Sequence, residues 1–410
     1  MANIQQFTHD SRVIEAITDI KSKCNGRQFS DIVDGAGNQY VDLVMEGGGV
    51  LGIALTGYTY ALEQAGIRFL GIGGTSAGSI NALMIAALGT PAEAKSEKLV
   101  KLLAEMPMAT FIDGDDDARD FSDAVVEKAA MLKLLWKGMQ IVDNLKEDLG
   151  LNPGKAFFDW LGVQLAGAGI HTNANLLAKL AVTPTGLRVR EGGELTSEDK
   201  CGRLAMVAAD ITTETKVEFP KMAGLYWPDP DIINPACFAR ASMSIPFFFQ
   251  PFIVSNCPPN INDAWQKAGY FGSPPTSVMF MDGGIMSNFP INLFHKPYRV
   301  PRAPTFGAKI GVERMQPAAI AKPKQLLAAV FNAARHTLDV DFIVQNPDYR
   351  HLVTMIDTAD HNWLNFNMED KDKVDLFARG ARAAADFLCL FDWPNYKAVR
   401  KDIAEAFLKN

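Results

Sequence analysis

A serine flanked by very small residues lies at the centre of the segment 68–81. Gly74, Ser76 and Gly78 have the G-x-S-x-G spacing of a nucleophile elbow, a sharp strand-to-helix turn that holds a serine out of the sheet. Glycine suits the flanking positions because side chains there would collide across so tight a turn. A helix predicted over 80–88 follows, and unpaired N–H groups at its start favour developing negative charge. The pattern predicts a serine nucleophile, although a glycine-rich turn with an ordinary serine cap fits the pentapeptide equally well.

A second glycine-rich stretch lies upstream, between a predicted buried strand and a predicted helix. It fits the G-x-G-x-x-G pattern of dinucleotide sites and consists of Gly47, Gly48, Gly49, Val50, Leu51 and Gly52. Such a site needs an acidic residue roughly 20 positions on, and no Asp or Glu lies between Glu63 and the serine turn. A phosphate-binding P-loop is excluded because no Gly-Lys-Ser/Thr follows. The stretch therefore predicts backbone N–H donors, from Gly47 to Val50, that form an oxyanion hole.

A carboxylate is predicted at the end of a later strand. Asp282 follows the predicted strand 277–281 and precedes Gly283 and Gly284, which allow close approach of backbone. At the carboxyl end of a strand in an α/β sheet, this side chain could accept the proton of Ser76 directly. A Ser-Asp-His triad is also open, because four histidines follow Asp282 in the chain: His295, His336, His351 and His361.

The elements that position these residues follow one another in β-α-β-α order. A strand over 39–45, a helix to 64, a strand over 67–72 and the helix 80–88 have short connections, which predicts a parallel sheet. Further helices are predicted over 11–23, 91–106, 121–149, 155–165, 174–180, 324–345, 369–388 and 396–408. Further strands are predicted over 204–209, 216–219, 307–312 and 351–357.

The composition favours a globular protein with a large core. The chain has 410 residues, 48% of them apolar, and a net charge of −7, with no basic stripe that would bind nucleic acid. No secretory signal pattern is present, and no apolar run reaches the ~18 residues of a membrane span. Five scattered cysteines indicate neither disulfides nor a zinc site, and the acidic segment 113–124 lacks the glycine and glutamate of a calcium loop. We expect a cytoplasmic protein, at most peripheral at membranes, without metal, cofactor or nucleic-acid partner.

The glycine-rich stretch 47–52, the elbow 74–78 and the motif Asp282-Gly283-Gly284 occur in one order along the chain. Together they resemble the patatin-like phospholipases, a family of lipid acyl hydrolases, and the segments 207–213 and 241–246 resemble two further blocks of that family. The resemblance implies a three-layer α/β/α sandwich with a mostly parallel central sheet. It implies an acyl hydrolase domain over 37–390, with an N-terminal helical extension over 1–36 and a C-terminal helix over 391–410. It also implies a Ser76–Asp282 dyad, with the oxyanion held by backbone N–H groups of the glycine loop.

One position departs from the family pattern. The family usually carries Arg or Lys where this chain has Leu51, so the resemblance supports acyl-ester hydrolysis more than recognition of a phosphate headgroup. The expected substrate is a lipid or another acyl ester. A non-catalytic lipid-binding protein on the same fold is the alternative from a different class. The aromatic segment 242–252 could line an acyl-chain pocket or belong to the packed core.

Overall fold

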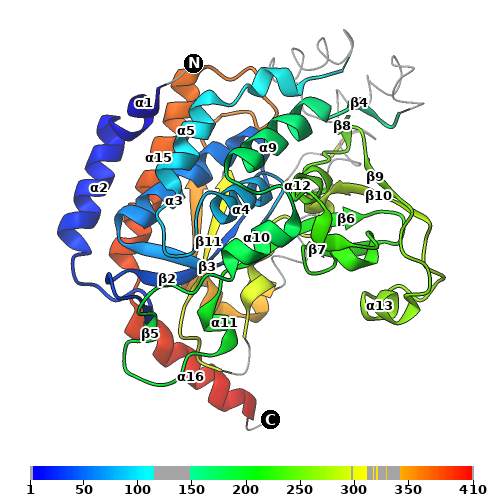
Figure 1. Ribbon diagram of the computed structural model, residues 1–410. Coiled ribbons are helices and arrows are strands. Elements are labelled where there is room, and N and C mark those ends of the chain that lie inside the picture. Colours follow the sequence, from blue (N-terminus) through cyan, green and yellow to red (C-terminus); the bar gives the residue numbers. More distant parts are fainter. Residues whose placement is uncertain are drawn as a thin grey trace.

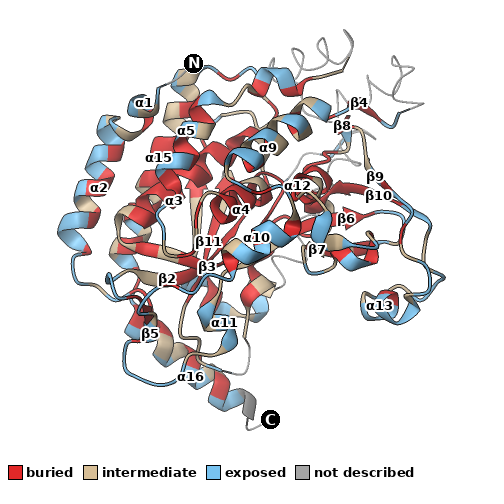
Figure 2. Cartoon of the chain, viewed as in Figure 1, coloured by how far each residue is buried: buried red, intermediate tan, exposed pale blue. Residues whose placement is uncertain are grey.

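The computed structural model of the chain describes residues 3–114, 148–296, 299–311, 317, 320–321, 329 and 342–408 (Figure 1). His336 and most of the helices predicted over 121–149 and 324–345 lie outside the described residues. Within the described part, one large cluster of apolar side chains joins the central sheet to the helices that cover it (Figure 2).

A central sheet runs through the middle of the protein. In the described part of the chain it contains ten strands. Five neighbours run parallel and are, in spatial order, β12 (Val353–Asp357), β11 (Thr305–Gly311), β2 (Gln39–Met45), β3 (Ile67–Thr75) and β6 (Arg203–Asp210). The others pair antiparallel and are β1 (Ile32–Val33), β5 (Arg188–Val189), β7 (Thr215–Phe219), β9 (Phe252–Ser255) and β10 (Ser277–Asp282). A separate two-stranded sheet joins β4 (Gly150–Asn152) and β8 (Phe247–Phe249).

The sheet is mixed, so the prediction of a mostly parallel sheet was wrong. Among the described strands of the central sheet, four neighbouring pairs are parallel and five are antiparallel. β6 and β7 are joined by residues 211–214, a connection too short for the crossover of about a dozen residues that a parallel pair needs. β10 also enters beside β6 in the opposite direction. The second helical layer of a three-layer sandwich stays a prediction.

Helices cover the sheet around β2, β3 and β6. α3 (Gly52–Gln64) connects β2 to β3, α4 (Ala77–Ala87) follows β3, and α15 (Asp370–Leu390) lies along α3 (Figure 1). α3 and α4 are buried along nearly their whole length, so neither has the polar face of a surface helix. The other described helices are α1 (Ile4–Thr8), α2 (Ser11–Lys23), α5 (Ser96–Glu105), α9 (Lys155–Gly167), α10 (Asn173–Leu180), α11 (Ser197–Lys200), α12 (Ala236–Ser242), α13 (Asn262–Lys267) and α16 (Trp393–Leu408).

Most of the predicted bounds of helices and strands are confirmed to within a few residues. One helix begins later than predicted. The helix predicted over 91–106 begins at Ser96. The carboxylate of Glu63 accepts the N–H groups of Lys95 and Ser96 at 2.8 and 2.7 Å, and these bonds fix the start of α5. This anchor comes from a distant residue, so the local pattern gave no sign of it.

The helices at both ends of the chain pack on the same protein body. Phe7 of α1 contacts the ring of Phe377 on α15 edge to face, and α2 lies against α15. On α16, Arg400 forms a buried ion pair with Asp348 at 2.9 Å. Among the described helices, none combines the length and the hydropathy that a membrane crossing requires.

The ends of β3 and β10 meet beside β6. Thr75, the last residue of β3, pairs with Val207, and Asp282, the last residue of β10, pairs with the next residue, Ala208. Both strands lie on the same side of β6, because β7 occupies the other side at these positions. The carboxyl ends of two strands therefore face each other along one edge of β6. This joint brings Ser76, which follows β3, next to Asp282.

Candidate active site

Ser76 lies at the turn between β3 and α4 in an unusual backbone conformation. Its φ of 51° and ψ of −119° fall where non-glycine residues are rarely found. The Ser76 N–H donates to the hydroxyl oxygen of Ser242 at 2.9 Å, and that hydroxyl donates to the carbonyl of Val207 at 2.5 Å. These buried hydrogen bonds fix the elbow against β6 and α12.

Gly74 and Gly78 allow the chain to turn this tightly. A Cβ atom on Gly74 would lie 2.5 Å from the carbonyl carbon of Gly78. A Cβ atom on Gly78 would lie 2.2 Å from the carbonyl oxygen of Met45 at the end of β2. Both contacts are with backbone, which cannot rotate away, so a side chain at either position would force the elbow open.

The glycine loop lies beside the elbow, and two of its N–H groups are already bonded. Gly47 donates to the backbone carbonyl of Asn288 and Val50 donates to that of Trp363, both at 3.0 Å. An N–H group that donates to a protein carbonyl is not available to an oxyanion without breaking that bond. Gly47 and Val50 are therefore poor candidates for the oxyanion hole in this conformation.

Gly48 and Gly49 differ from their neighbours in the loop. Among the described residues, no acceptor bonds to either of their N–H groups. Gly49 also lines the same cavity as Ser76. Of the predicted oxyanion donors, these two are the ones left available.

A buried network that the sequence analysis missed fixes the glycine loop. The side-chain amide of Asn288 donates to the carbonyl of Gly47 at 3.2 Å and to the carboxylate of Glu46 at 3.1 Å. Glu46 also accepts the N–H of Ile310 at 2.9 Å, and the ammonium of Lys309 lies 3.9 Å from it. The loop is thereby tied to β11 and to the segment that follows Asp282. The available signal was Glu46 itself, a charged residue directly after the apolar run 43–45.

Replacement of Asn288 by alanine is expected to lower kcat of any ester hydrolysis by about tenfold or more, because the loop loses two hydrogen bonds that position its donors. The measurement is steady-state kinetics on a soluble p-nitrophenyl ester. Asn292, an exposed asparagine on the same segment, provides the matched control and should tolerate alanine. An unchanged kcat in Asn288→Ala would show that the network does not position the donors.

Asp282 begins a tight turn at the end of β10. Its carboxylate accepts the N–H of Gly284 at 2.8 Å, which caps the short 3-10 helix that follows. A Cβ atom on Gly283 would lie 2.1 Å from the carbonyl oxygen of Val207 and 3.0 Å from the side chain of Thr75. Glycine at this position therefore lets the Asp282 turn close directly onto the end of β3.

The segment after α12 contacts both halves of the site. Ser242 accepts the N–H of Ser76, and the carbonyl of Ser244 accepts the N–H of Asp282 at 2.8 Å. The buried guanidinium of Arg240 donates to the hydroxyl of Ser244 at 2.5 Å, and its burial lowers the pKa of this guanidinium to about 10. This pKa leaves Arg240 charged at neutral pH. Arg240 therefore acts as a fixed anchor beneath the site.

An apolar cavity of about 70 Å³ opens at Ser76, and its lining is almost wholly hydrocarbon and sulfur. A second cavity of about 80 Å³ shares six lining residues with it and extends between α3, α4 and α5. The shared residues are Gly49, Val50, Ala77, Ile80, Met106 and Met108. An apolar lining of this kind beside Ser76 suits the hydrocarbon part of a substrate.

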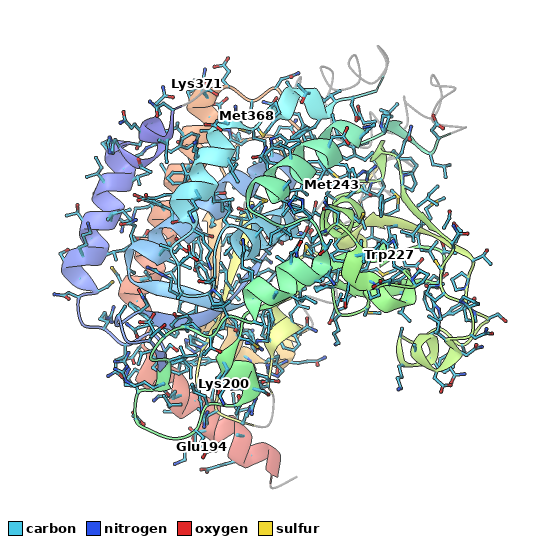
Figure 3. All side chains as sticks on the ribbon, in the orientation of Figure 1. Glu194, Lys200, Trp227, Met243, Met368 and Lys371 are labelled. Carbon is cyan, nitrogen blue, oxygen red and sulfur yellow. The ribbon has the colours of Figure 1, made fainter. Side chains whose placement is uncertain are left out.

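The aromatic segment 242–252 is divided between the two roles considered for it. Met243, at the end of α12 (Figure 3), and Ile245 line the Ser76 cavity. Phe248 and Phe249 are buried and pack against the ring of Phe366. Part of the segment therefore lines the cavity, and part belongs to the core.

Two of the histidines considered as a base, His295 and His361, have partners away from Ser76. Nδ1 of His295 lies 2.8 Å from the hydroxyl of Tyr349, and burial lowers the pKa of this imidazole. Nε2 of His361 lies 3.0 Å from the carboxylate of Asp375 on α15. No histidine in the described part of the chain lines the cavity at Ser76.

Comparison with known proteins identifies the family of this chain. The sequence model of the Patatin-like phospholipase family matches residues 43–295, a range that includes the glycine loop, the elbow and Asp282. The chain therefore belongs to the patatin-like phospholipases, a family of lipid hydrolases. A relative in Bacillus subtilis (strain 168), "Uncharacterized protein YqhO", is 27% identical over 351 residues, which cover 85% of this chain and 98% of that protein.

Two solved bacterial structures are also similar to this chain. VipD from Legionella pneumophila is 14% identical, with a TM-score of 0.39 over 88% of this chain and 70% of that chain. ExoU from Pseudomonas aeruginosa, solved as a heterodimer with SpcU, is 16% identical, with a TM-score of 0.35 over 88% of this chain and 54% of that chain. This chain thus spans about half of the ExoU chain.

Proposed function

We propose that this protein is a serine acyl hydrolase that cleaves fatty-acyl esters of lipids through a Ser76–Asp282 dyad. The observation that carries the proposal is the joint beside β6, where the ends of β3 and β10 meet. An apolar cavity for the acyl chain and two available N–H donors lie at the same place. A nucleophile, a base, oxyanion donors and an acyl site are the parts that ester hydrolysis needs.

In the proposed first step, the Asp282 carboxylate takes the proton of the Ser76 hydroxyl as Oγ bonds to the ester carbonyl carbon. The carbonyl electron pair moves to oxygen, and the N–H groups of Gly48 and Gly49 stabilise that oxyanion. When the carbonyl re-forms, the C–O bond to the alcohol breaks, and Asp282 returns the proton to the leaving oxygen. Water, deprotonated by Asp282, then attacks the carbonyl carbon of the acyl-enzyme. The C–Oγ bond breaks, the fatty acid leaves, and Asp282 returns the proton to Oγ of Ser76.

The cavity supports an acyl substrate without defining its headgroup. Leu51 is buried, so the position where the family usually carries a cation contributes an apolar side chain here. We therefore extend the proposal to lysolipids, acylglycerols and phospholipids alike, taken up by a cytoplasmic protein in transient contact with a membrane surface.

A fluorophosphonate probe provides the direct test, because it modifies an activated serine and carries its own reporter. We expect labelling at Ser76, located by peptide mass spectrometry, and hydrolysis of at least one member of a panel of phospholipids, lysolipids, acylglycerols and p-nitrophenyl esters. Turnover should persist in EDTA. Tight lipid binding with neither labelling nor product would instead identify a non-catalytic lipid-binding protein.

A further inference from the structure

A further cavity, of about 240 Å³ and separate from the two beside Ser76, lies near the amino-terminal ends of β6 and β11. Arg203, the first residue of β6, lines it and pairs with Gly71 of β3. Gly71 precedes Ser76 by five residues, so about 16 Å of strand separates this cavity from the elbow. Figure 3 shows Glu194, whose carbonyl accepts a hydrogen bond from the cavity residue Arg302, at the end of the molecule away from Met243, which lines the Ser76 cavity. The two sites are therefore distinct.

The lining of this cavity is positively charged although the whole chain carries a net charge of −7. Its charged members are four cations and two carboxylates: Arg203, Lys296, Arg299, Arg302, Asp42 and Asp199. The cations come from two segments that are far apart in sequence and converge on one space. Clustered cations on an acidic protein attract a small anion.

The carboxylates around the cavity do not balance these cations. Asp42 pairs with Arg203 at 2.7 Å, and Asp199 pairs with Arg302 at 2.9 Å.

A third carboxylate, that of Glu198, forms ion pairs with two of the cations that line the cavity. Glu198 pairs with Lys296 and also with Arg299, the latter at 2.9 Å. Its hydrogen bond from Lys296 holds the pKa of Glu198 below its usual range, so this carboxylate is charged at neutral pH. One positive charge therefore remains without a counterion among the described residues.

Several guanidinium donors also remain available. A guanidinium has five N–H donors, and among the described residues the guanidinium of Arg299 donates one hydrogen bond, from Nη2 to Glu198. The Nε of Arg203 is buried and has no acceptor among the described residues. Arginines with donors to spare match the oxygens of a phosphate group in pairs.

We propose that this cavity binds a phosphate monoester, with Arg299 and Arg302 as the main contacts and Arg203 behind them. A phosphate presents three oxygens and up to two negative charges, which fits cations that surround the space from two segments. The cavity has room for a small ester together with its phosphate. The phosphate could belong to a soluble metabolite or to a lipid headgroup, since both present the same group.

Titration of inorganic phosphate into the full-length protein, followed by calorimetry and by the melting temperature in a low-salt chloride buffer, tests the site. We expect saturable binding and a phosphate-dependent rise in the melting temperature. Arg299→Ala and Arg302→Ala should each weaken binding by about tenfold or more. Arg382→Ala is the matched control, because Arg382 is about as exposed as Arg302 and is also ion-paired, with Asp19 and Asp386.

Arg299 is 52% exposed and pairs with one carboxylate, so Arg299→Ala should fold even if Arg302→Ala does not. Absence of phosphate binding in the wild type, equal weakening by Arg382→Ala, or tighter binding of succinate than of phosphate would each overturn the proposal. Labelling of Ser76 and ester hydrolysis should be unchanged in Arg299→Ala. The outcome here is therefore separate from the outcome for the proposed hydrolase.

A second arm distinguishes the source of the phosphate. Glycerol 3-phosphate is compared with vesicles of phosphatidylcholine that do or do not contain phosphatidic acid. Binding to phosphatidic acid vesicles that Arg299→Ala removes would identify a lipid headgroup as the ligand. Binding of the soluble ester alone would identify a soluble metabolite. Binding of neither would overturn the proposal.

Discussion

Replacement of Ser76 by alanine is expected to abolish ester hydrolysis, with a rate loss of about 10³-fold or more. In the proposed reaction the Ser76 oxygen forms the acyl-enzyme, and the hydroxyls of the neighbouring Thr75 and Ser79 donate to backbone carbonyls. Alanine adopts the Ser76 backbone with no more strain than serine, and the N–H that donates to Ser242 remains. The melting temperature should therefore stay within about 2 °C of the wild type.

Ser79 provides the matched control for this variant. It is buried on the same helix, and its hydroxyl donates to the carbonyl of Ser76 at 2.7 Å. Ser79→Ala should keep its rate within about tenfold of the wild type, because it loses one hydrogen bond worth about 1 kcal/mol. Full esterase activity in Ser76→Ala, or fluorophosphonate labelling of that variant at another serine, would place the active site elsewhere.

Replacement of Asp282 by asparagine is expected to reduce acylation about 10³-fold or more, because an amide cannot accept the serine proton as a carboxylate does. Asparagine keeps an oxygen that can accept the N–H of Gly284, so the turn at the end of β10 should survive. The measurement is the rate of fluorophosphonate labelling at Ser76, which reports attack by the serine oxygen and does not depend on the later hydrolysis of an acyl-enzyme. Circular dichroism and the melting temperature check the fold.

Asp210→Asn separates the base from a general effect of removing a buried carboxylate. Asp210 ends β6, two residues after the partner of Asp282, and its carboxylate accepts the N–H groups of Thr212 and Thr213. Burial raises the pKa of Asp210. In Asp210→Asn, the fluorophosphonate probe should label Ser76 at nearly the wild-type rate. Asp210 lies at the end of the β6–β10 pairing that is farther from Ser76.

Histidine variants decide between a dyad and a triad. His295→Gln and His361→Gln should keep most activity, because both side chains have partners outside the Ser76 cavity. His336→Gln and His351→Gln complete the set. A folded histidine variant that loses several orders of magnitude in labelling rate would make that histidine the base, with Asp282 as its orienting partner.

The candidate serine turn was predictable from the sequence because part of its geometry depends on local sterics. A Cβ atom on Gly74 would meet the backbone of Gly78 within the same turn, which is a local effect, whereas the crowding at Gly78 comes from Met45 at the end of β2. The strands and helices around the elbow were also predictable, since the buried-type strands and the glycine stops are local signals. The order of the glycine loop, the elbow and Asp282 then indicated the family before any contact was known.

Only the tertiary structure decided the direction of β10 and which backbone N–H groups of the glycine loop already donate to protein carbonyls. Residues 75, 207 and 282 are far apart in the chain, and their meeting depends on β10 running antiparallel to β6. Short-range patterns do not specify strand direction, because it depends on which segments pack against each other. Long-range packing also places the carbonyls of residues 288 and 363 where they accept the N–H groups of Gly47 and Val50. Sequence thus determined which groups the site contains, and long-range packing decided which of them remain available for chemistry.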